Sequence, residues 1–114
     1  TIQSTGGGAA TLTKPNTIKV FYDSKTTFGA ADNSFGVSSS SDAGAGQTAI
    51  NFTNAFDSAF YVAAGMSFDA DGLLFSNQSD KIAGSCEIRN FGGLLASGGA
   101  VDADIEVMIT GDLA

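Results

Sequence analysis

The segment from Val101 to Thr110 constrains the fold more than any other part of the chain, because its side chains change character at almost every step. One set is apolar and consists of Val101, Ala103, Ile105, Val107 and Ile109. The other set is mainly polar and contains Asp102, Asp104, Glu106 and Thr110. Successive side chains of a β-strand point to opposite faces, so this two-residue period predicts a strand with one buried face.

Shorter runs with the same period recur along the chain and are separated by Gly, Asp, Ser and Asn. They include residues 18–22, 35–37, 50–52, 59–68 and 81–90. Such spacing is typical of an all-β protein, and we expect an antiparallel β-sandwich or barrel-like fold of six to eight short strands. A helix over residues 51–64 is the competing interpretation because of its Ala content, but its Val, Phe, Tyr and Asn residues are weak helix formers.

Two further features organise the chain. Residues 34–53 read as two alternating arms around a loop that carries Asp42, Gly44 and Gly46, which predicts a β-hairpin with a loop longer than the two-residue minimum. Residues 1–17 are rich in Gly and Thr and show no sustained period. We therefore expect a flexible N-terminal arm over 1–17 and a single β-sandwich domain over 18–114.

Composition disfavours several classes of function. The net charge is −7, from 12 acidic and 5 basic residues, and such a surface repels nucleic acid and anionic membranes. No apolar run approaches the roughly 20 residues of a membrane-spanning helix, and residues 1–17 lack signal-peptide features, so we expect synthesis in a cytoplasm. The chain has no His, and its one Cys, Cys86, lies in an alternating run, where we expect a buried structural residue.

Two acidic patterns could carry chemistry. Asp69 and Asp71, in FDADG, resemble the start of a calcium loop, although an acidic turn between strands explains the same residues and later ligands are missing. Asp102, Asp104 and Glu106 could pair for glycoside hydrolysis, but their alternation along one strand favours a solvated face. The sequence thus predicts a protein that is not an enzyme and needs no cofactor.

The hairpin region also carries a resemblance. Its F-x-V-S-S arm at Phe35, its D-x-G-x-G loop at Asp42 and its T-x-I-N-F-T arm at Thr48, followed by AFDSAFYV, resemble a β-rich module of tailed-bacteriophage virion proteins. That module is common near the C-termini of tail fibres and in other small virion proteins. The resemblance covers about residues 18–111, includes the closing VDADIEVMITG, and breaks down over residues 69–85.

The resemblance implies a non-enzymatic virion structural protein on the exterior of the particle. The leading interpretation is a head decoration or cement protein that self-associates and docks on the major capsid protein. The alternative is a tail-fibre or receptor-binding tip that contacts the host surface. A cellular carbohydrate-binding β-sandwich is a third possibility, which the absence of Trp disfavours.

We also expect self-association, because residues 59–68 are apolar on both faces of the predicted strand. Virion accessory proteins often pack about a threefold axis, so we predict a homotrimer. The predicted interface residues are Phe60, Tyr61, Val62 and Met66, with Leu94 and Leu95 in a Gly-flanked loop.

Overall fold

A computed structural model describes residues 16–24, 29–68, 72–76, 78–92 and 99–113. The first strand already begins at Asn16, two residues before the predicted start of the sandwich. The rest of the predicted arm, residues 1–15, lies outside the described residues.

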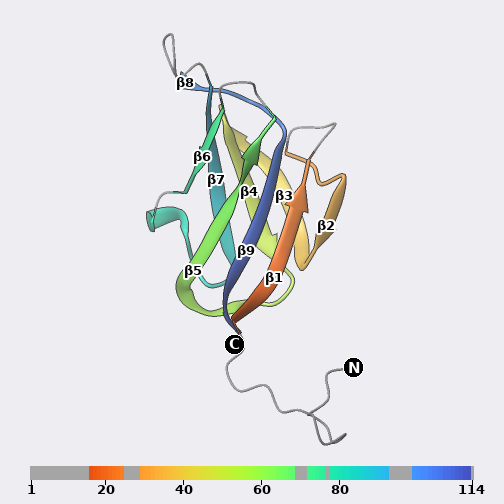
Figure 1. Cartoon of the computed structure of the whole chain (residues 1–114), viewed down its shortest axis with the longest axis vertical. Helices are drawn as coiled ribbons and strands as arrows, with labels where there is room; N and C mark the ends of the chain where they lie inside the picture. Colours follow the sequence, from red (N-terminus) through yellow and green to blue (C-terminus); the bar gives the residue numbers. More distant parts are fainter. Residues whose placement is uncertain (1–15, 25–28, 69–71, 77, 93–98, 114) are drawn as a thin grey trace, which may run out of the picture.

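The described residues form two antiparallel sheets that pack against each other (Figure 1). The first sheet has the order β2 (Asn33–Phe35), β1 (Asn16–Asp23), β9 (Ile105–Leu113), β5 (Phe56–Ser67). The second has the order β3 (Val37–Gly44), β4 (Gln47–Phe52), β7 (Ser85–Gly92), β6 (Leu73–Phe75), and β8 (Gly99–Ala100) pairs with the end of β7. A single 3₁₀ turn, η1 (Gln78–Asp80), precedes β7 in the described part of the chain.

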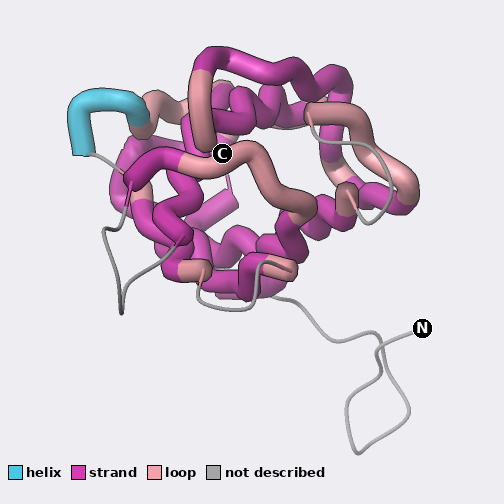
Figure 2. The backbone as a smooth tube through the Cα atoms, turned by 90° about the horizontal axis from the view of Figure 1, so that it is seen from above, coloured by secondary structure: helices cyan, strands magenta, loops and turns pink. Residues whose placement is uncertain are grey.

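This arrangement confirms the predicted all-β antiparallel sandwich. Seen along the strands, the two sheets surround a common interior (Figure 2). The helix considered for residues 51–64 is wrong, because most of that stretch lies in β4 and β5. The six longer strands agree with the predicted six to eight. Three further strands, β2, β6 and β8, have only two or three residues and are too short to show a two-residue period.

The core lies between the inner faces of the two sheets. Val107 and Ile109 from β9 are almost completely buried there, as are Ile50 from β4 and Ile88 from β7. At one end three aromatic rings close the core: Phe56 stacks on Tyr61 at a centroid distance of 4.7 Å, and Phe52 meets Phe56 edge-on at 5.3 Å. Such pairs add roughly 0.5–1.5 kcal/mol beyond the burial of their area.

A β-bulge in β1 changes one predicted orientation. Alternation alone places Ile18, Val20 and Tyr22 on one face, and the last two are indeed fully buried. The register with β9 shifts between Ile18 and Val20, and Ile18 is 55% exposed on the opposite side of the sheet. An extra residue in one strand of a pair reverses the faces beyond it, so the bulge turns Ile18 outward.

The hairpin of β3 and β4 is tighter than predicted. Pairing continues to Gly44 opposite Gln47, so only Ala45 and Gly46 form the turn. Gly46 has a φ of 65°, and a Cβ at this position would meet the carbonyl oxygen of Asn90 at 2.6 Å. The Ser-rich stretch before the turn thus belongs to strand β3 and not to a loop. Ser and Asp side chains at an exposed sheet edge do not interrupt the pairing.

The chain crosses between the sheets at Gly36, which separates β2 from β3 and has a φ of 72°. Phe35 thus belongs to the first sheet and Val37 to the second, and the two do not form one arm of a hairpin. The last strand also begins later than predicted, at Ile105. Before it, the carboxylate of Asp102 accepts a hydrogen bond of 2.6 Å from the amide of Gly46.

Candidate functional site

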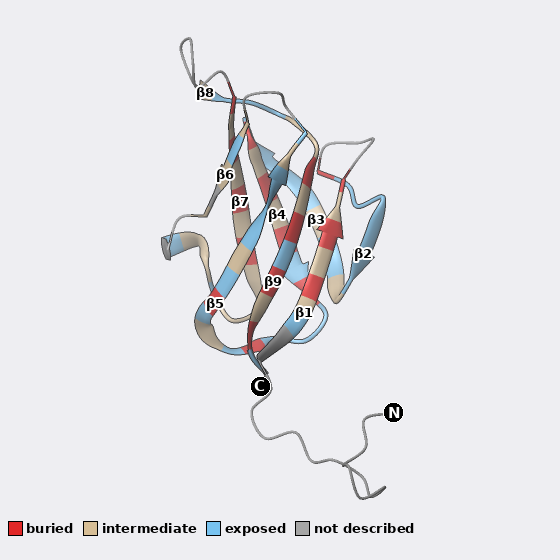
Figure 3. Ribbon diagram, viewed as in Figure 1, coloured by how far each residue is buried: buried red, intermediate tan, exposed pale blue. Residues whose placement is uncertain are grey.

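The outer face of the first sheet is apolar, and no other element of the described residues covers it. We call it the apolar face and define it by outward side chains from all four strands of that sheet. They are Ile18 and Phe21 of β1, Phe35 of β2, Phe60, Val62, Ala64 and Met66 of β5, and Met108 of β9. Figure 3 shows exposed segments of β5, β9 and β1 on the side that faces the reader.

Strand register aligns these side chains in rows across the sheet. Phe35 is opposite Phe21, Phe21 is opposite Met108, and Met108 is opposite Ala64, so one row crosses all four strands. A second row joins Ile18, Thr110 and Val62. Directly paired residues of neighbouring strands share a face, so each row lies on the outer side of the sheet. Neither row contains a charged side chain.

The apolar face is hollowed beside Ala64, Gly65 and Met66, toward the end of β5. A shallow depression of about 180 Å³ lies over β5 and β9 next to Phe21 of β1. Its lining residues are Phe21, Ala64, Gly65, Met66, Glu106, Val107 and Met108. Gly65 contributes no side chain here, and a Cβ at this position would lie 1.9 Å from the carbonyl oxygen of Glu106. Near the other end of β5 Phe60 projects from the sheet and is 86% exposed.

The predicted interface residues divide into three groups. Phe60, Val62 and Met66 lie exposed on the apolar face. Tyr61 does not: it is 3% exposed, points into the core, and belongs to the aromatic cluster, so its inclusion as an exposed residue is wrong. Both faces of this strand are apolar, and alternation could not say which one turns inward. Leu94 and Leu95 lie outside the described residues.

Four residues of the apolar face were not predicted to belong to it: Ile18, Phe21, Phe35 and Met108. They come from three strands distant in sequence from residues 59–68, and only the sheet order brings them beside β5. Met108 alone could have been identified from the sequence, because it is the one apolar residue on the otherwise polar side of the 101–110 pattern.

The outer face of the second sheet is hydrophilic over β3, β4 and β7, and we call it the polar face. Its residues are Ser39, Ser41, Gln47, Ala49, Asn51, Ser85, Glu87 and Arg89, aligned by register. Arg89 Nη2 lies 2.8 Å from Asp80 Oδ2, and Asn51 Nδ2 donates to Ser39 Oγ at 3.0 Å. Polar side chains predominate here and several are exposed, so this face has the character of an ordinary solvated sheet.

The group that comes nearest to a reactive cluster consists of Tyr61, Lys81 and Cys86. The Tyr61 hydroxyl donates to the backbone carbonyls of Ser85 at 2.8 Å and of Ile82 at 3.1 Å, and Lys81 Nζ lies 4.6 Å from the Tyr61 ring centroid. Burial raises the pKa of the Cys86 thiol to about 12, and burial also raises the pKa of Tyr61. Both groups are therefore protonated near neutral pH, which suits a structural role and not a nucleophile.

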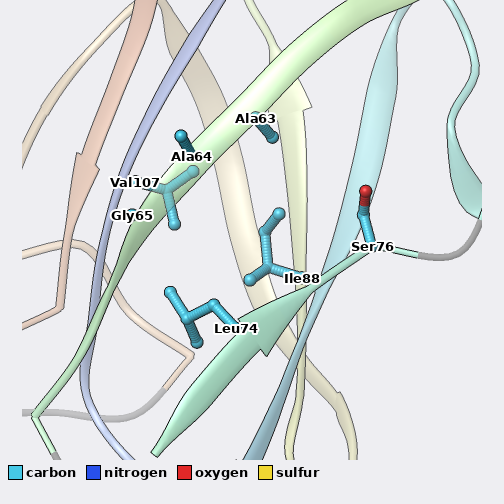
Figure 4. Close-up of a pocket in the computed structure, with 7 residues that line it drawn as sticks. All are labelled: Ala63, Ala64, Gly65, Leu74, Ser76, Ile88 and Val107. Carbon is cyan, nitrogen blue, oxygen red and sulfur yellow. The ribbon is translucent and has the colours of Figure 1, made fainter.

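A gap between β5 and β6 opens toward the core (Figure 4). In this view Leu74 and Ile88 from one sheet lie across from Ala63 and Val107 of the other. Its volume is about 40 Å³, close to the roughly 30 Å³ that one water occupies in the liquid. We interpret it as the place where the edges of the two sheets do not meet, and not as a substrate pocket.

Asp69 and Asp71, the calcium candidates, lie outside the described residues. Within the described ranges no three His, Cys, Asp or Glu side chains are placed to hold a metal ion. In the same ranges no helix is long and apolar enough to cross a membrane.

Comparison with known proteins gives no relative from which a function could be transferred. No family model matches the chain, and neither the curated proteins nor the solved structures contain a match.

Proposed function

We propose that this chain is a non-enzymatic structural protein of a tailed-bacteriophage virion, and specifically a decoration protein that stabilises the head by docking on the major capsid protein. The apolar face is the observation that carries this proposal. A protein without a use for such a surface has little reason to keep Phe60 at 86% exposure and Phe35 at 68%. Large exposed apolar patches are typical of protein–protein contact sites.

The chemistry of the described residues supports a structural role. The chain has no His to act as a general base or zinc ligand, and its one thiol is buried with a raised pKa. The depression on the apolar face is lined almost entirely by apolar groups, with Glu106 as its one ionisable residue. Such a surface binds other apolar surfaces better than it binds sugars or phosphates, which need several polar partners.

The resemblance of the hairpin region to phage virion modules supplies the virion part of the proposal. Head placement is preferred to tail placement because a broad apolar face on one side of a β-sandwich suits packing against a shell.

The decisive experiment locates the protein in the particle. Gold-labelled antibodies against the chain should mark the heads of purified virions. Purified protein added to heads that lack it should also raise the temperature at which they release DNA. Label at the tail tip, with no effect on heads, would favour the receptor-binding alternative. Absence of the chain from purified particles would contradict a virion role altogether.

A further inference from the structure

We infer that the apolar face packs against the same face of a second copy of this chain, with Phe60 of each copy seated in the hollow of the other. The hollow is the depression bordered by Phe21, Met66 and Met108. This inference concerns the purified chain in solution and does not depend on the proposed function. Because the same face is proposed to dock on the capsid, the pair would have to separate before docking.

The size of the face fits one partner of this kind. Ile18, Phe35, Phe60, Val62, Met66 and Met108 are between 48% and 86% exposed. At about 200 Å² for each large apolar residue, they present on the order of 800 Å² to solvent. A stable protein–protein interface of standard size buries about 800 Å² on each partner, whereas the largest apolar patch of a typical monomer is about 300–600 Å².

The face is complementary to itself in shape. It carries a projecting aromatic ring at one end of β5, at Phe60, and a hollow near the other end, at Gly65 and Met66. A twofold axis between them, near Val62 and Ala64, would bring each Phe60 to the hollow of the partner. The hollow, at about 180 Å³, is large enough for an aromatic ring, since an engineered cavity of about 150 Å³ binds benzene.

The position of the charges permits this contact. The two rows that cross the middle of the face contain only apolar residues and Thr110, so no ion lies on them. Asp23 and Glu106 are opposite each other in the strand register at one end of the face, and Asp112 lies at the other end. Asp23 and Asp112 would form part of a solvated rim, as polar residues do in most interfaces, and Glu106, which lines the hollow, would border the seated Phe60 ring.

Symmetry favours a pair over a ring. A twofold interface uses one patch twice, whereas a head-to-tail ring needs two different patches that fit each other. Within the described ranges one extensive apolar face is present, and the polar face opposite it offers no match. In a pair, the apolar face of each copy therefore covers the apolar face of the other.

Sedimentation equilibrium of the full chain tests the inference. From about 1 to 100 µM, the wild type should shift from monomer to dimer. Phe60→Ala should raise the dissociation constant about 30-fold or more, the effect expected of a central aromatic anchor. Val62→Glu should abolish the dimer, because two carboxylates would meet near the axis. Ser41→Glu, on the polar face, is the matched control and should dimerise as the wild type does.

Circular dichroism must show that each variant is folded; if Val62→Glu is not, Phe35→Glu replaces it, because Phe35 is 68% exposed on the three-residue strand β2. A wild type that stays monomeric at 100 µM, or that forms a trimer, would overturn the inference. So would a Phe60→Ala protein that dimerises like the wild type, or a Ser41→Glu protein that does not dimerise.

Discussion

The outward residues of β5 and β9 include Phe60, Val62, Met66 and Met108, whereas those of β4 and β7 include Asn51, Glu87 and Arg89. The inner faces of the same strands are more alike, since buried aliphatic and aromatic side chains predominate on both and Thr48 and Asn90 are the buried polar residues of β4 and β7. Folding of one sandwich needs only those inner faces. We attribute the contrast between the outer faces to what the folded protein contacts, which is water on the polar face and, in our proposal, another apolar surface on the apolar face.

The largest expected effect is a difference in the free energy of unfolding between variants of two neighbouring residues on β5, Tyr61 and Phe60. Tyr61→Ala should lower the free energy of unfolding by about 3–5 kcal/mol, because it removes a buried ring from the core and leaves two carbonyls without their donor. Phe60→Ala should change it by no more than about 0.5 kcal/mol in the monomer. Urea unfolding at submicromolar concentration measures both values. Equal losses would contradict the assignment of Phe60 to an outer face that folding does not need.

Backbone packing beneath the apolar face gives the next effect. Gly65→Ala should destabilise the protein by roughly 1–3 kcal/mol, since its Cβ would overlap the carbonyl oxygen of Glu106 and force β5 and β9 apart. Gly84→Ala is the matched control, because a Cβ there meets nothing within 4 Å. Thermal unfolding of the two variants makes the comparison, and a Gly65→Ala protein as stable as the wild type would show that β5 can shift freely.

The polar face should depend on its ion pair only weakly. Arg89→Ala removes the 2.8 Å contact with Asp80, and both side chains are partly exposed, so we expect a loss of about 0.2–1 kcal/mol. The loss should shrink at high salt, where exposed charges are screened. Urea titrations at low and high ionic strength test this. A loss that does not change with salt would mean that Arg89 acts by packing.

The smallest effect concerns the acidic end of the first sheet. Burial, with the nearby carboxylates of Asp32 and Asp23, raises the pKa of Asp104. A carboxyl with a raised folded-state pKa binds more protons in the folded than in the unfolded protein, so its contribution to stability falls as pH rises through that range. Asp104→Asn should therefore slightly raise the melting temperature at pH 7 and have no such effect at pH 3, where the carboxylates are mostly protonated. A gain that is equal at both pH values would exclude charge repulsion as its cause.

The sequence by itself determined most of the longer strands and, where polar residues alternate with apolar ones, many of the side chains that turn inward. Of the five residues predicted to be inward over residues 101–110, Ile105, Val107 and Ile109 are buried, whereas Val101 and Ala103 precede the strand and Val101 is 37% exposed. The reason is local: successive residues of a strand face opposite sides, and apolar side chains leave water.

The tertiary structure decided what this local rule leaves open. Phe60 and Tyr61 satisfy the alternation equally well in either orientation. Tyr61 lies in the core, where its ring packs on Phe52 and Phe56 and its hydroxyl donates to the carbonyls of Ile82 and Ser85. The bulge in β1 turned Ile18 outward, and the pairing of β1 with β9 placed Phe21 next to Met108, 87 positions apart in sequence. The apolar face is a product of strand order. Contacts between distant segments set that order, and it cannot be predicted from the alternation of residues within any single segment.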